Sequence, residues 1–551
     1  MSSKSFTKIM AANRGEIAVR IMTASHELGI RSVAIYSYED RTNLHRSVAD
    51  ESYILDRTKS PVAAYLDIQT IVDIAKKNGV SAIHPGYGFL SENASFAQAV
   101  EDAGITFIGP TVDNLKMMAD KTSARKVAIQ NNIPVVPGTA EPVKTIEEAR
   151  EFCHSIGYPV IIKAAFGGGG KGMRVVYSDE ELQQNFELAS REAAAAFGNG
   201  TIFLERYVEE PRHIEVQVIG DGTGRVIHLY ERDCSVQRRH QKVIENAPAV
   251  NLDPAIRSAI LADACKLCSL IKYRSAGTVE FLVDKNGQHY FMEVNPRIQV
   301  EHTVTEEITG INIVAKQIEL AQGKTFEELG LSQENIQTHG YAIQARITTE
   351  DPSKNFQPDS GFLRVFNQSV GNGIRLDGIG YSNYEVTPIY DSLLVKCTAR
   401  GQTWLETIQK MNRALSEFKV EGVSTNIPFL LNVLKKPDYQ QGKVTTFFIQ
   451  NNPDLLTYEK KFYHDDSVIH YLANLIVNGH PSELGATGPA PGPTNPTAPT
   501  VSSKQPPTGL RSIFVKEGPK AFAKAVRAHK GLLLTDTTWR DGHQSLLATR
   551  L

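Results

Sequence analysis

The first hundred residues alternate between short apolar stretches and longer amphipathic ones, and this alternation restricts the possible folds more than any other feature of the chain. Strands are expected at residues 8–12, 31–37, 81–86 and 105–110, with helices near 16–29, 63–77 and 95–104. Repeated strand–helix units predict a mainly parallel sheet with helices on both faces. Asn13-Arg14-Gly15 follows the first strand and could either close a tight connection or begin a phosphate-binding helix.

The composition argues against several classes of protein. The net charge is −2, which disfavours binding to the phosphate backbone of a nucleic acid. No apolar stretch approaches the length of about 18 residues that a membrane span needs. Five cysteines are too few for a disulfide framework, and the Cys265–Cys268 pair lacks partners for a zinc site. Because residues 1–7 are also too short for a targeting segment, we expect a reducing, cytoplasmic location.

Periodicity and composition divide the chain into six segments. They are residues 1–122, 123–330 with a smaller unit at about 136–204, 331–460, a helical segment 461–480, a proline-rich linker 481–510 and a final segment 511–551. Eight of the 26 prolines lie between residues 481 and 507, and such a composition cannot bury enough apolar surface to fold. The basic stretch after the linker is expected to form a solvated helix.

A glycine run at residues 167–172 lies between two predicted strands. It fits the spacing GxGxxG, but a strand follows it instead of a helix, so a dinucleotide-binding turn is excluded. A Walker loop is excluded because Gly172, not Ser or Thr, follows Lys171. What remains is a flexible loop that could fold over phosphates as a lid, with Lys163 near its base as a phosphate partner. The alternative is a mobile hairpin without a ligand.

Two glutamates are predicted to face each other across a hairpin. Asn286-Gly287 is a strong signal for a two-residue turn, and with that turn Val283 would pair with Tyr290 and Glu280 with Glu293. Like charges so placed repel each other unless a cation lies between them, and carboxylate oxygens suit Mg²⁺ or Mn²⁺. A slipped register would instead leave a solvated pair.

The segment after this hairpin is unusually polar. If it stays extended, Asn295, Arg297, Gln299 and Glu301 share one face with Glu293. Arg297 could clamp an oxyanion, and Glu301 could act as a general base. The alternative is an exposed edge strand. A basic cluster at residues 238–242 is expected to supply cations for small anions such as bicarbonate or phosphate.

Several motifs together resemble one family. The segments IIKAAFGGGGKGMRVV, FLERYVEEPRHIEVQV, ERDCSVQRRHQKVIENAP, FMEVNPRIQVEHTVTE and YAIQARITTEDP are similar to biotin carboxylase, an ATP-grasp enzyme, over about residues 6–460. The resemblance implies an α/β fold, α+β in part, with an N-terminal parallel-sheet domain, an ATP-grasp domain with a glycine-loop lid, and a C-terminal αβ domain. It implies ATP- and bicarbonate-dependent carboxylation of biotin through carboxyphosphate, with Mg or Mn as the metal.

The resemblance also implies a role for each matching residue. Those that would contact the nucleotide are Lys121, Lys163, Gly168, Gly169, Glu205, His213, Gln237 and His240. Those that would bind the metal are Glu280, Glu293 and Asn295. Those that would bind bicarbonate are Lys242, Arg297, Gln299 and Glu301, with Glu301 as the base. Arg346 would lie near the ureido oxygen of biotin and stabilise its enolate together with Arg297.

The last residues resemble a different domain. TDTTWRDGHQSLLATR is similar to the start of the carboxyltransferase barrel of the pyruvate carboxylases, where Asp541 would bind Zn or Mn and Arg540 and Gln544 would contact pyruvate. One strand cannot close a barrel, and no biotinylation motif is present, so biotin would be supplied in trans. The implied partners are a biotin carboxyl carrier domain, a carboxyltransferase domain and further copies of the chain, usually in a tetramer.

Two alternatives stay open at this point. One is the biotin carboxylase part of an acyl-CoA carboxylase, against which the final segment argues. The other is a nucleotide-binding regulatory module without catalysis, against which Lys242, Arg297 and Glu301 argue.

Overall fold

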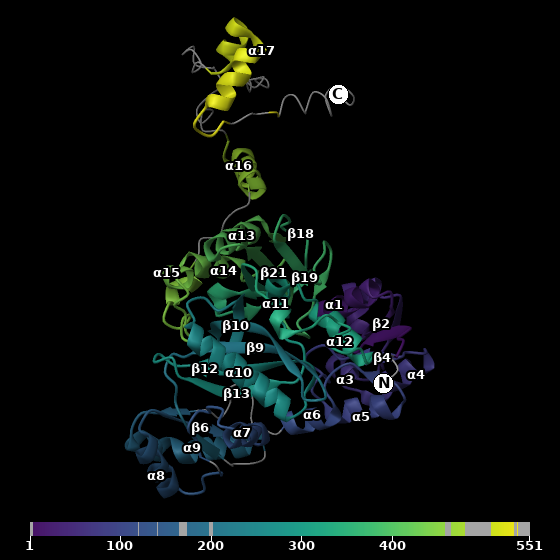
Figure 1. Cartoon of the computed structure of the whole chain (residues 1–551), viewed down its shortest axis with the longest axis vertical. Helices are drawn as coiled ribbons and strands as arrows, with labels where there is room; N and C mark the ends of the chain where they lie inside the picture. The colour runs from purple at the N-terminus through teal and green to yellow at the C-terminus, as the bar shows by residue number, and fades with distance from the viewer. Residues whose placement is uncertain are drawn as a thin grey trace. The chain divides into compact units, whose positions relative to one another are not determined.

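The computed structural model describes residues 4–119, 121–139, 141–164, 174–197, 202–457, 464–479, 509–533 and 537. Residues 1–460 form one compact unit and residues 461–551 a second (Figure 1). The second unit contains helices α16 (His464–Asn478) and α17 (Arg511–Ala528). Helix α17 has no buried residue, as the basic stretch predicted, but it is interrupted at Gly518, whose φ of 82° is not helical. Gly168, Gly169, residues 480–508, Arg540, Asp541 and Gln544 lie outside the described residues.

The N-terminal part is the predicted parallel sheet, with one further strand at Glu51–Ile54 that the sequence did not lead us to expect. Its strands follow the order β3-β2-β1-β4-β5, and each pair is parallel. The strands are β1 (Lys8–Ala11), β2 (Arg31–Tyr36), β3 (Glu51–Ile54), β4 (Ala82–His84) and β5 (Thr106–Phe107). The helices are α1 (Gly15–Glu27), α2 (Leu44–Val48), α3 (Pro61–Tyr65), α4 (Ile68–Lys77), α5 (Ala94–Asp102) and α6 (Val112–Ala119). The single helix expected at 63–77 is wrong, because the Asp67 side chain accepts from the Thr70 N–H and begins α4 as a separate helix.

The turn at Asn13 is a structural connection. The Asn13 side-chain amide donates to the carbonyls of Pro85 (2.7 Å) and Tyr87 (2.8 Å), which belong to the loop after β4. Arg14 forms a bidentate pair with Asp40 at 2.7 Å. These contacts join the carboxyl ends of neighbouring parallel strands, and they favour the tight connection over a phosphate-binding helix start.

A large antiparallel sheet forms the centre of the first unit. Its order is β13-β12-β9-β10-β11-β14-β21-β19. The strands are β9 (Arg212–Asp221), β10 (Val226–Arg238), β11 (Gln241–Ala247), β12 (Arg274–Val283), β13 (His289–Asn295), β14 (Tyr341–Thr348), β19 (Ile374–Gly378) and β21 (Leu393–Gly401). The sheet therefore continues across residue 330, where one of the predicted segment boundaries lies.

The two faces of this sheet differ in polarity. Helix α10 (Pro254–Leu270) packs on β9 and β10 (Figure 1), and Ile214, Val216 and Val218 of β9 join its apolar core. Because side chains alternate along a strand, His213 and Glu215 point to the opposite face. Helix α11 (His302–Thr309) packs on the sheet through β10, β11, β14 and β21.

A smaller sheet contains the strands that precede and follow the glycine run in the sequence. Strands β6 (Val160–Ala164), β7 (Arg174–Val176) and β8 (Ile202–Arg206) pair antiparallel in the order β7-β6-β8, so the two predicted flanking strands are confirmed, while the glycine run itself lies outside the described residues. Helices α8 (Ile146–Ile156) and α9 (Asp179–Phe197) pack against these strands, whereas α7 (Lys121–Gln130) packs against α6 and against β13 of the large sheet. The phosphate contact of the loop stays a prediction.

The predicted hairpin has the right glutamate pair but the wrong register near its turn. The loop has three residues, with the Asp284 N–H bonded to the Gln288 carbonyl, so Val283 pairs with His289 and not with Tyr290. A register shift between Glu280 and Phe281 compensates for the longer loop, and Glu280 pairs with Glu293 as expected.

The expectation that residues 293–301 form one extended strand is wrong. Strand β13 ends at Asn295, and a turned segment leads to Glu301, which precedes α11. The Arg297 N–H bonds to the Asn295 carbonyl, and the His302 N–H bonds to the Gln299 carbonyl. The polar side chains nevertheless gather at one site, because the turn folds the segment back toward β12.

The remaining helices of the first unit pack at two places. Helix α12 (Ile313–Ala321) packs on α1 and β12, whereas α13 (Trp404–Glu417) packs on β14, β19 and β21 and contacts α14 (Ile427–Lys435) and α15 (Pro437–Gln440). The short strands of this unit are β15 (Glu350–Asp351), β16 (Gln357–Pro358), β17 (Gly361–Phe362), β18 (Val365–Asn367), β20 (Glu385–Val386) and β22 (Lys419–Glu421). Among the described residues, no helix is both long and apolar enough to cross a membrane. All five cysteines are free thiols, and burial raises the pKa of Cys265 to about 11.

The turn between β10 and β11 carries backbone strain. Arg238 pairs with Gln241, and the two residues between them, Arg239 and His240, have φ values of 50° and 65°. Both therefore lie in the left-handed region, as in a type I′ turn, where residues other than glycine pay about 1–2 kcal/mol.

We predict that Arg239→Gly stabilises the protein by about 0.5–1 kcal/mol, because glycine adopts this conformation without strain but loses more entropy on folding. Arg239→Ala removes the same charge and keeps the β-carbon, so it should give no gain. Urea unfolding of the three proteins measures the effect, and an equal shift for both variants would contradict the strain argument.

Candidate active site

A cavity of about 1330 Å³ lies on the polar face of the large sheet. It brings together most of the residues that the sequence predicted, namely Lys163, Glu205, His213, Gln237, His240, Lys242, Glu280, Glu293, Asn295, Arg297, Gln299, Glu301 and Arg346. The side chain of Lys121 and the two lid glycines lie outside the described part of the chain.

The Lys242 ammonium is shared by three carboxylates. Its Nζ lies 2.5 Å from Glu215 Oε2, 2.9 Å from Glu280 Oε1 and 2.7 Å from Glu301 Oε1. Burial alone would lower the pKa of Lys242, but the three carboxylates outweigh burial and hold this pKa well above its usual range. Lys242 is therefore a charged ammonium at neutral pH.

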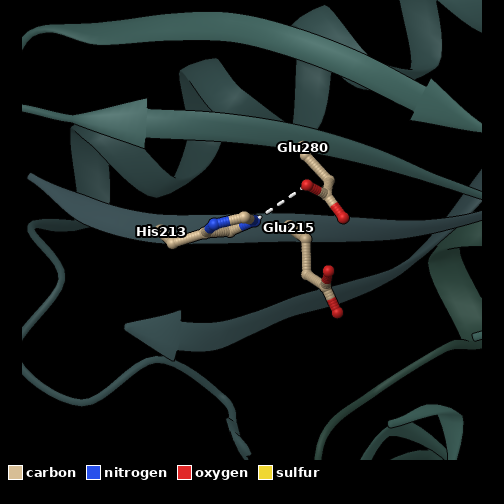
Figure 2. A group of neighbouring side chains, drawn as sticks. All are labelled: His213, Glu215 and Glu280. Carbon is tan, nitrogen blue, oxygen red and sulfur yellow. Dashed lines mark ion pairs between the residues drawn. The ribbon is translucent and has the colours of Figure 1, made fainter. Parts of the chain in front are cut away.

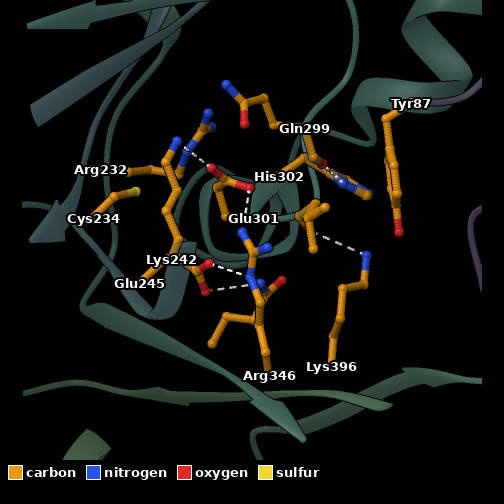
Figure 3. Close-up of polar contacts among 12 residues, drawn as sticks. Tyr87, Arg232, Cys234, Lys242, Glu245, Gln299, Glu301, His302, Arg346 and Lys396 are labelled. Atoms are coloured by element: carbon orange, nitrogen blue, oxygen red, sulfur yellow. Dashed lines mark hydrogen bonds and ion pairs between the residues drawn. The ribbon is translucent and has the colours of Figure 1, made fainter. Parts of the chain in front are cut away.

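Glu301 lies between two cations. Besides Lys242, Arg346 Nη2 lies 3.0 Å from Glu301 Oε2 (Figure 3). Burial would raise the pKa of Glu301, but Lys242, Arg346 and Arg232 lower it far below the usual range. In this arrangement Glu301 is an ionised carboxylate and a weak base. It can accept a proton only after a substrate has replaced at least one of its cationic partners.

Three further residues of the site were not predicted from the sequence. Glu215 is fully buried and pairs with Arg232 Nε at 2.5 Å, while Glu245 pairs with Arg346 Nε at 2.6 Å. A readable signal existed for Glu215, because polar residues alternate with apolar ones along β9. Arg232 and Glu245 gave no such signal, since only the order of the strands brings them to the site.

The predicted metal ligands lie close together. Glu280 Oε1 accepts from Lys242, from Asn295 Nδ2 at 2.9 Å and from Gln299 Nε2 at 3.1 Å. His213 Nε2 lies 3.0 Å from Glu280 Oε2 (Figure 2). Burial would raise the pKa of Glu280, but Lys242 and His213 lower it well below its usual range.

The oxygens of Glu280 and Glu293 fit a hard divalent cation. Because Glu280 Oε1 already accepts three hydrogen bonds, a cation bound here would take the place of at least one of these donors. The predicted metal site therefore fits the donor chemistry of the residues, and it stays a prediction.

The remaining predicted residues lie toward the rim. Lys163 Nζ pairs with Glu205 Oε2 at 2.5 Å, and Arg297 Nε pairs with Glu92 Oε1 at 2.5 Å. The basic cluster at 238–242 does not act as one patch, because Arg238 stacks on the Phe356 ring at 4.1 Å and donates to Asn355. Of this cluster, Lys242 pairs with the buried carboxylates.

The sequence matches three family descriptions. These are the N-terminal domain of biotin carboxylase at residues 5–115, the ATP-binding domain of the carbamoyl-phosphate synthase L chain at 120–329, and the C-terminal domain of biotin carboxylase at 344–451. The chain is 54% identical over 549 residues to mitochondrial pyruvate carboxylase of Mus musculus and 53% identical over 558 residues to pyruvate carboxylase of Aspergillus terreus. It covers 46% and 47% of these proteins and is itself covered to 100% and 99%.

Solved structures agree with these matches. The biotin carboxylase domain of Hydrogenobacter thermophilus 2-oxoglutarate carboxylase, solved as a dimer with MgADP, ADP and bicarbonate, is 45% identical with a TM-score of 0.78. The alignment covers 83% of this chain and all of that one. Rhizobium etli pyruvate carboxylase with acetyl coenzyme A is 46% identical with a TM-score of 0.79, over 99% of this chain and 49% of that one.

These matches confirm the expected fold and relationship, and the chain belongs to the biotin carboxylase family. It spans about half the length of the pyruvate carboxylases that it matches.

We predict that Lys242→Met destabilises the protein by about 3–5 kcal/mol at pH 8, because three buried carboxylates lose their shared cation. Without Lys242, burial raises the pKa values of Glu280 and Glu301 in the folded variant above the unfolded value of about 4.3. The folded variant then takes up protons as the pH falls. The difference in unfolding free energy between the parent and the variant should therefore become smaller between pH 8 and pH 5. In the parent, the pKa values of Glu280 and Glu301 are lowered. The stabilising contribution of these two carboxylates is therefore fully present between pH 8 and pH 5.

Urea unfolding at pH 8, 7, 6 and 5 measures this narrowing. Lys436→Met is a matched control, since Lys436 pairs with the exposed Asp454 at 2.7 Å and its loss should cost at most about 1 kcal/mol at every pH. A deficit for Lys242→Met that is the same at all four pH values would contradict the shared-cation argument.

Proposed function

We propose that this chain uses ATP and bicarbonate to carboxylate biotin through carboxyphosphate. The observation that carries the proposal is the position of Glu301, an ionised carboxylate held between Lys242 and Arg346 beside the Glu280–Glu293 pair. This arrangement places a prospective base among cations that suit a small anion, at the end of a cavity large enough for a nucleotide.

Residues at different places in the cavity have different proposed roles. Lys163 and the lid would hold the phosphates of ATP, and Lys242 and Arg297 would hold bicarbonate. Once bicarbonate displaces a cation from Glu301, this carboxylate removes the bicarbonate proton. The bicarbonate oxygen then attacks the γ-phosphate, and ADP leaves. Carboxyphosphate breaks into CO₂ and phosphate, the phosphate takes the N1′ proton, and Arg297 with Arg346 stabilises the biotin enolate that attacks CO₂.

A divalent cation at Glu280, Glu293 and Asn295 would neutralise phosphate charge during this transfer. Magnesium is the favoured cation, because its preference for carboxylates and nucleotide phosphates matches the residues present. MgADP and bicarbonate occur together in the related structure of the 2-oxoglutarate carboxylase domain, which supports the same pair of ligands here.

We further propose pyruvate as the final carboxyl acceptor. The relatives named above that align over the whole chain are pyruvate carboxylases, and the motif at residues 535–550 resembles their carboxyltransferase barrel. A carrier domain with biotin, a carboxyltransferase domain with Zn or Mn, and further copies of this chain are the proposed partners. The five free cysteines support a reducing compartment such as the cytoplasm.

Supplying a biotinylated carrier and a carboxyltransferase domain separately would test pyruvate as the carboxyl acceptor, and labelled oxaloacetate is the expected product. Transfer to an acyl-CoA would overturn it.

We predict that Glu301→Gln abolishes both bicarbonate-dependent ADP release and carboxybiotin formation, because no carboxyphosphate forms without an activated bicarbonate. Arg297→Ala should lose carboxybiotin formation by about 10²–10³ and keep part of the ADP release, since it acts on a later oxyanion. Both products are measured on the same samples with free biotin and labelled bicarbonate. Glu319→Gln is the control, because Glu319 pairs with Lys316 and Lys324 away from the cavity. Normal bicarbonate-dependent cleavage by Glu301→Gln would refute the base assignment.

We predict that Glu293→Gln raises the magnesium concentration needed for half-maximal ADP release by about tenfold, because a neutral amide is a poorer ligand than a carboxylate. The unfolding free energy should change by less than about 1 kcal/mol, since Glu293 is only partly buried. A magnesium titration of both proteins gives the answer. If the two curves coincide, Glu293 does not bind the metal.

A further inference from the structure

Arg232 of β10 is a completely buried arginine next to the active site. It lies directly opposite Glu215 of β9, whose side chain is also completely buried. Its guanidinium donates to four partners, which are Glu215 Oε1 (2.5 Å), Gln217 Oε1 (2.8 Å), Thr305 Oγ1 (3.0 Å) and Thr278 Oγ1 (3.1 Å). Because these partners come from β9, β12 and α11, the guanidinium is fixed in place and cannot turn toward another ligand.

Burial does not remove the charge of this guanidinium. Burial alone would lower the pKa of Arg232, but the carboxylates of Glu215 and Glu301 outweigh burial and raise this pKa above its usual range. Arg232 is therefore a permanent cation on the polar side of the sheet.

Glu215 connects Arg232 to the cavity. Its Oε1 accepts from Arg232 Nε, and its Oε2 lies 2.5 Å from Lys242 Nζ. Lys242 lines the cavity, whereas Arg232 and Glu215 do not. Glu215 thus has one cation that an entering anion can reach and one that it cannot reach.

This difference matters when a small anion binds to Lys242. The ammonium then moves part of its charge from the protein carboxylates to the anion. Glu301 keeps Arg346 as a second cation, and Glu215 keeps Arg232. A buried carboxylate that loses its only cation is strongly destabilised. Without Arg232, Glu215 would therefore hold the Lys242 ammonium and compete with the anion for it.

We propose that Arg232 is a positioning residue for the bicarbonate site, which acts as the permanent counter-ion of Glu215 and thereby leaves the Lys242 ammonium free to bind the substrate anion. Arg232 itself contacts no substrate, because it acts through Glu215 and Lys242. This inference rests on the proposed function, since bicarbonate is the anion that it concerns.

The other face of the same strand offers a matched control. Glu231 precedes Arg232 and therefore points to the opposite side of the sheet, toward α10. Its carboxylate is completely buried and pairs with Arg257 Nε of α10 at 2.7 Å. Neither Glu231 nor Arg257 lines the cavity. Arg257→Met thus leaves a buried carboxylate without its arginine, as Arg232→Met does, but away from the bicarbonate site.

The test measures the KM for bicarbonate from ADP release at saturating ATP and without biotin. The variants are Arg232→Met, the double variant Arg232→Met/Glu215→Gln and the control Arg257→Met. Arg232→Met should raise this KM about tenfold or more, because Glu215 then retains the Lys242 ammonium. The double variant lacks the competing carboxylate, so its KM should return to within about threefold of the parent value. Arg257→Met should keep the KM within about twofold of the parent value, although urea unfolding should show a loss of stability similar to that of Arg232→Met.

If Arg232→Met does not fold, Arg232→Gln takes its place. The amide of glutamine keeps a donor for Glu215 but carries no charge, and a rise of about threefold or more in the KM for bicarbonate is expected. An unchanged KM in the variant that folds would overturn the inference.

The double variant separates a counter-ion from a structural residue. If its KM for bicarbonate were about tenfold above the parent value, Arg232 would act only by fixing Thr278 and Thr305, and the inference would be wrong. The proposed function fails in a different way, by absence of bicarbonate-dependent ADP release in the parent protein.

Discussion

One ammonium group, that of Lys242, holds the active site together. A buried carboxylate without a partner costs several kcal/mol, and here three of them approach the same point. They come from β9, β12 and the start of α11, while Lys242 comes from β11. The strand order β12-β9-β10-β11 means that the lysine side chain reaches across two intervening strands. The charge of Lys242 thus links side chains on strands that are not direct neighbours in the sheet, in addition to the backbone hydrogen bonds that join each neighbouring pair.

The sequence predicted much of the fold, because period-two and strand–helix patterns depend on local chemistry. The parallel order of the N-terminal strands and the strands around the glycine run followed from such patterns. The hairpin shows their limit. The pairing of Glu280 with Glu293 was correct, yet the loop is one residue longer than Asn286-Gly287 suggests, and a register shift compensates for it. Neither feature has a local sequence signal, since the shift depends on packing against the neighbouring strand.

The site residues were predictable to different degrees. Sequence pattern alone indicated Glu280, Glu293, Arg297 and Glu301 and placed Lys242 in a basic cluster for small anions, whereas the family resemblance was needed for Arg346. Glu245 and Arg232 escaped both approaches, because their partners are far away in the sequence and meet them only through the order of the strands. Lys396 shows no distinctive motif either. A lysine in a strand is ordinarily solvated, and its complete burial against Glu16 emerges only from the structure.

Each of these four cations of the site is paired with a carboxylate of the protein. Lys163 pairs with Glu205, Arg297 with Glu92, Arg346 with Glu245, and Lys242 with three glutamates. Anionic substrates must therefore exchange places with protein carboxylates. Exposure makes this exchange easiest at the rim, where the Lys163 side chain is 37% exposed, and hardest at Lys242, where it is 12%. Under the proposed function, nucleotide phosphates would displace the outer ion pairs at low cost, and their charge would then weaken the inner ones. Glu301 would become a competent base only after its cationic partners have bound a substrate instead, so the ion pairs that stabilise the site would also keep it inactive until its anions have bound.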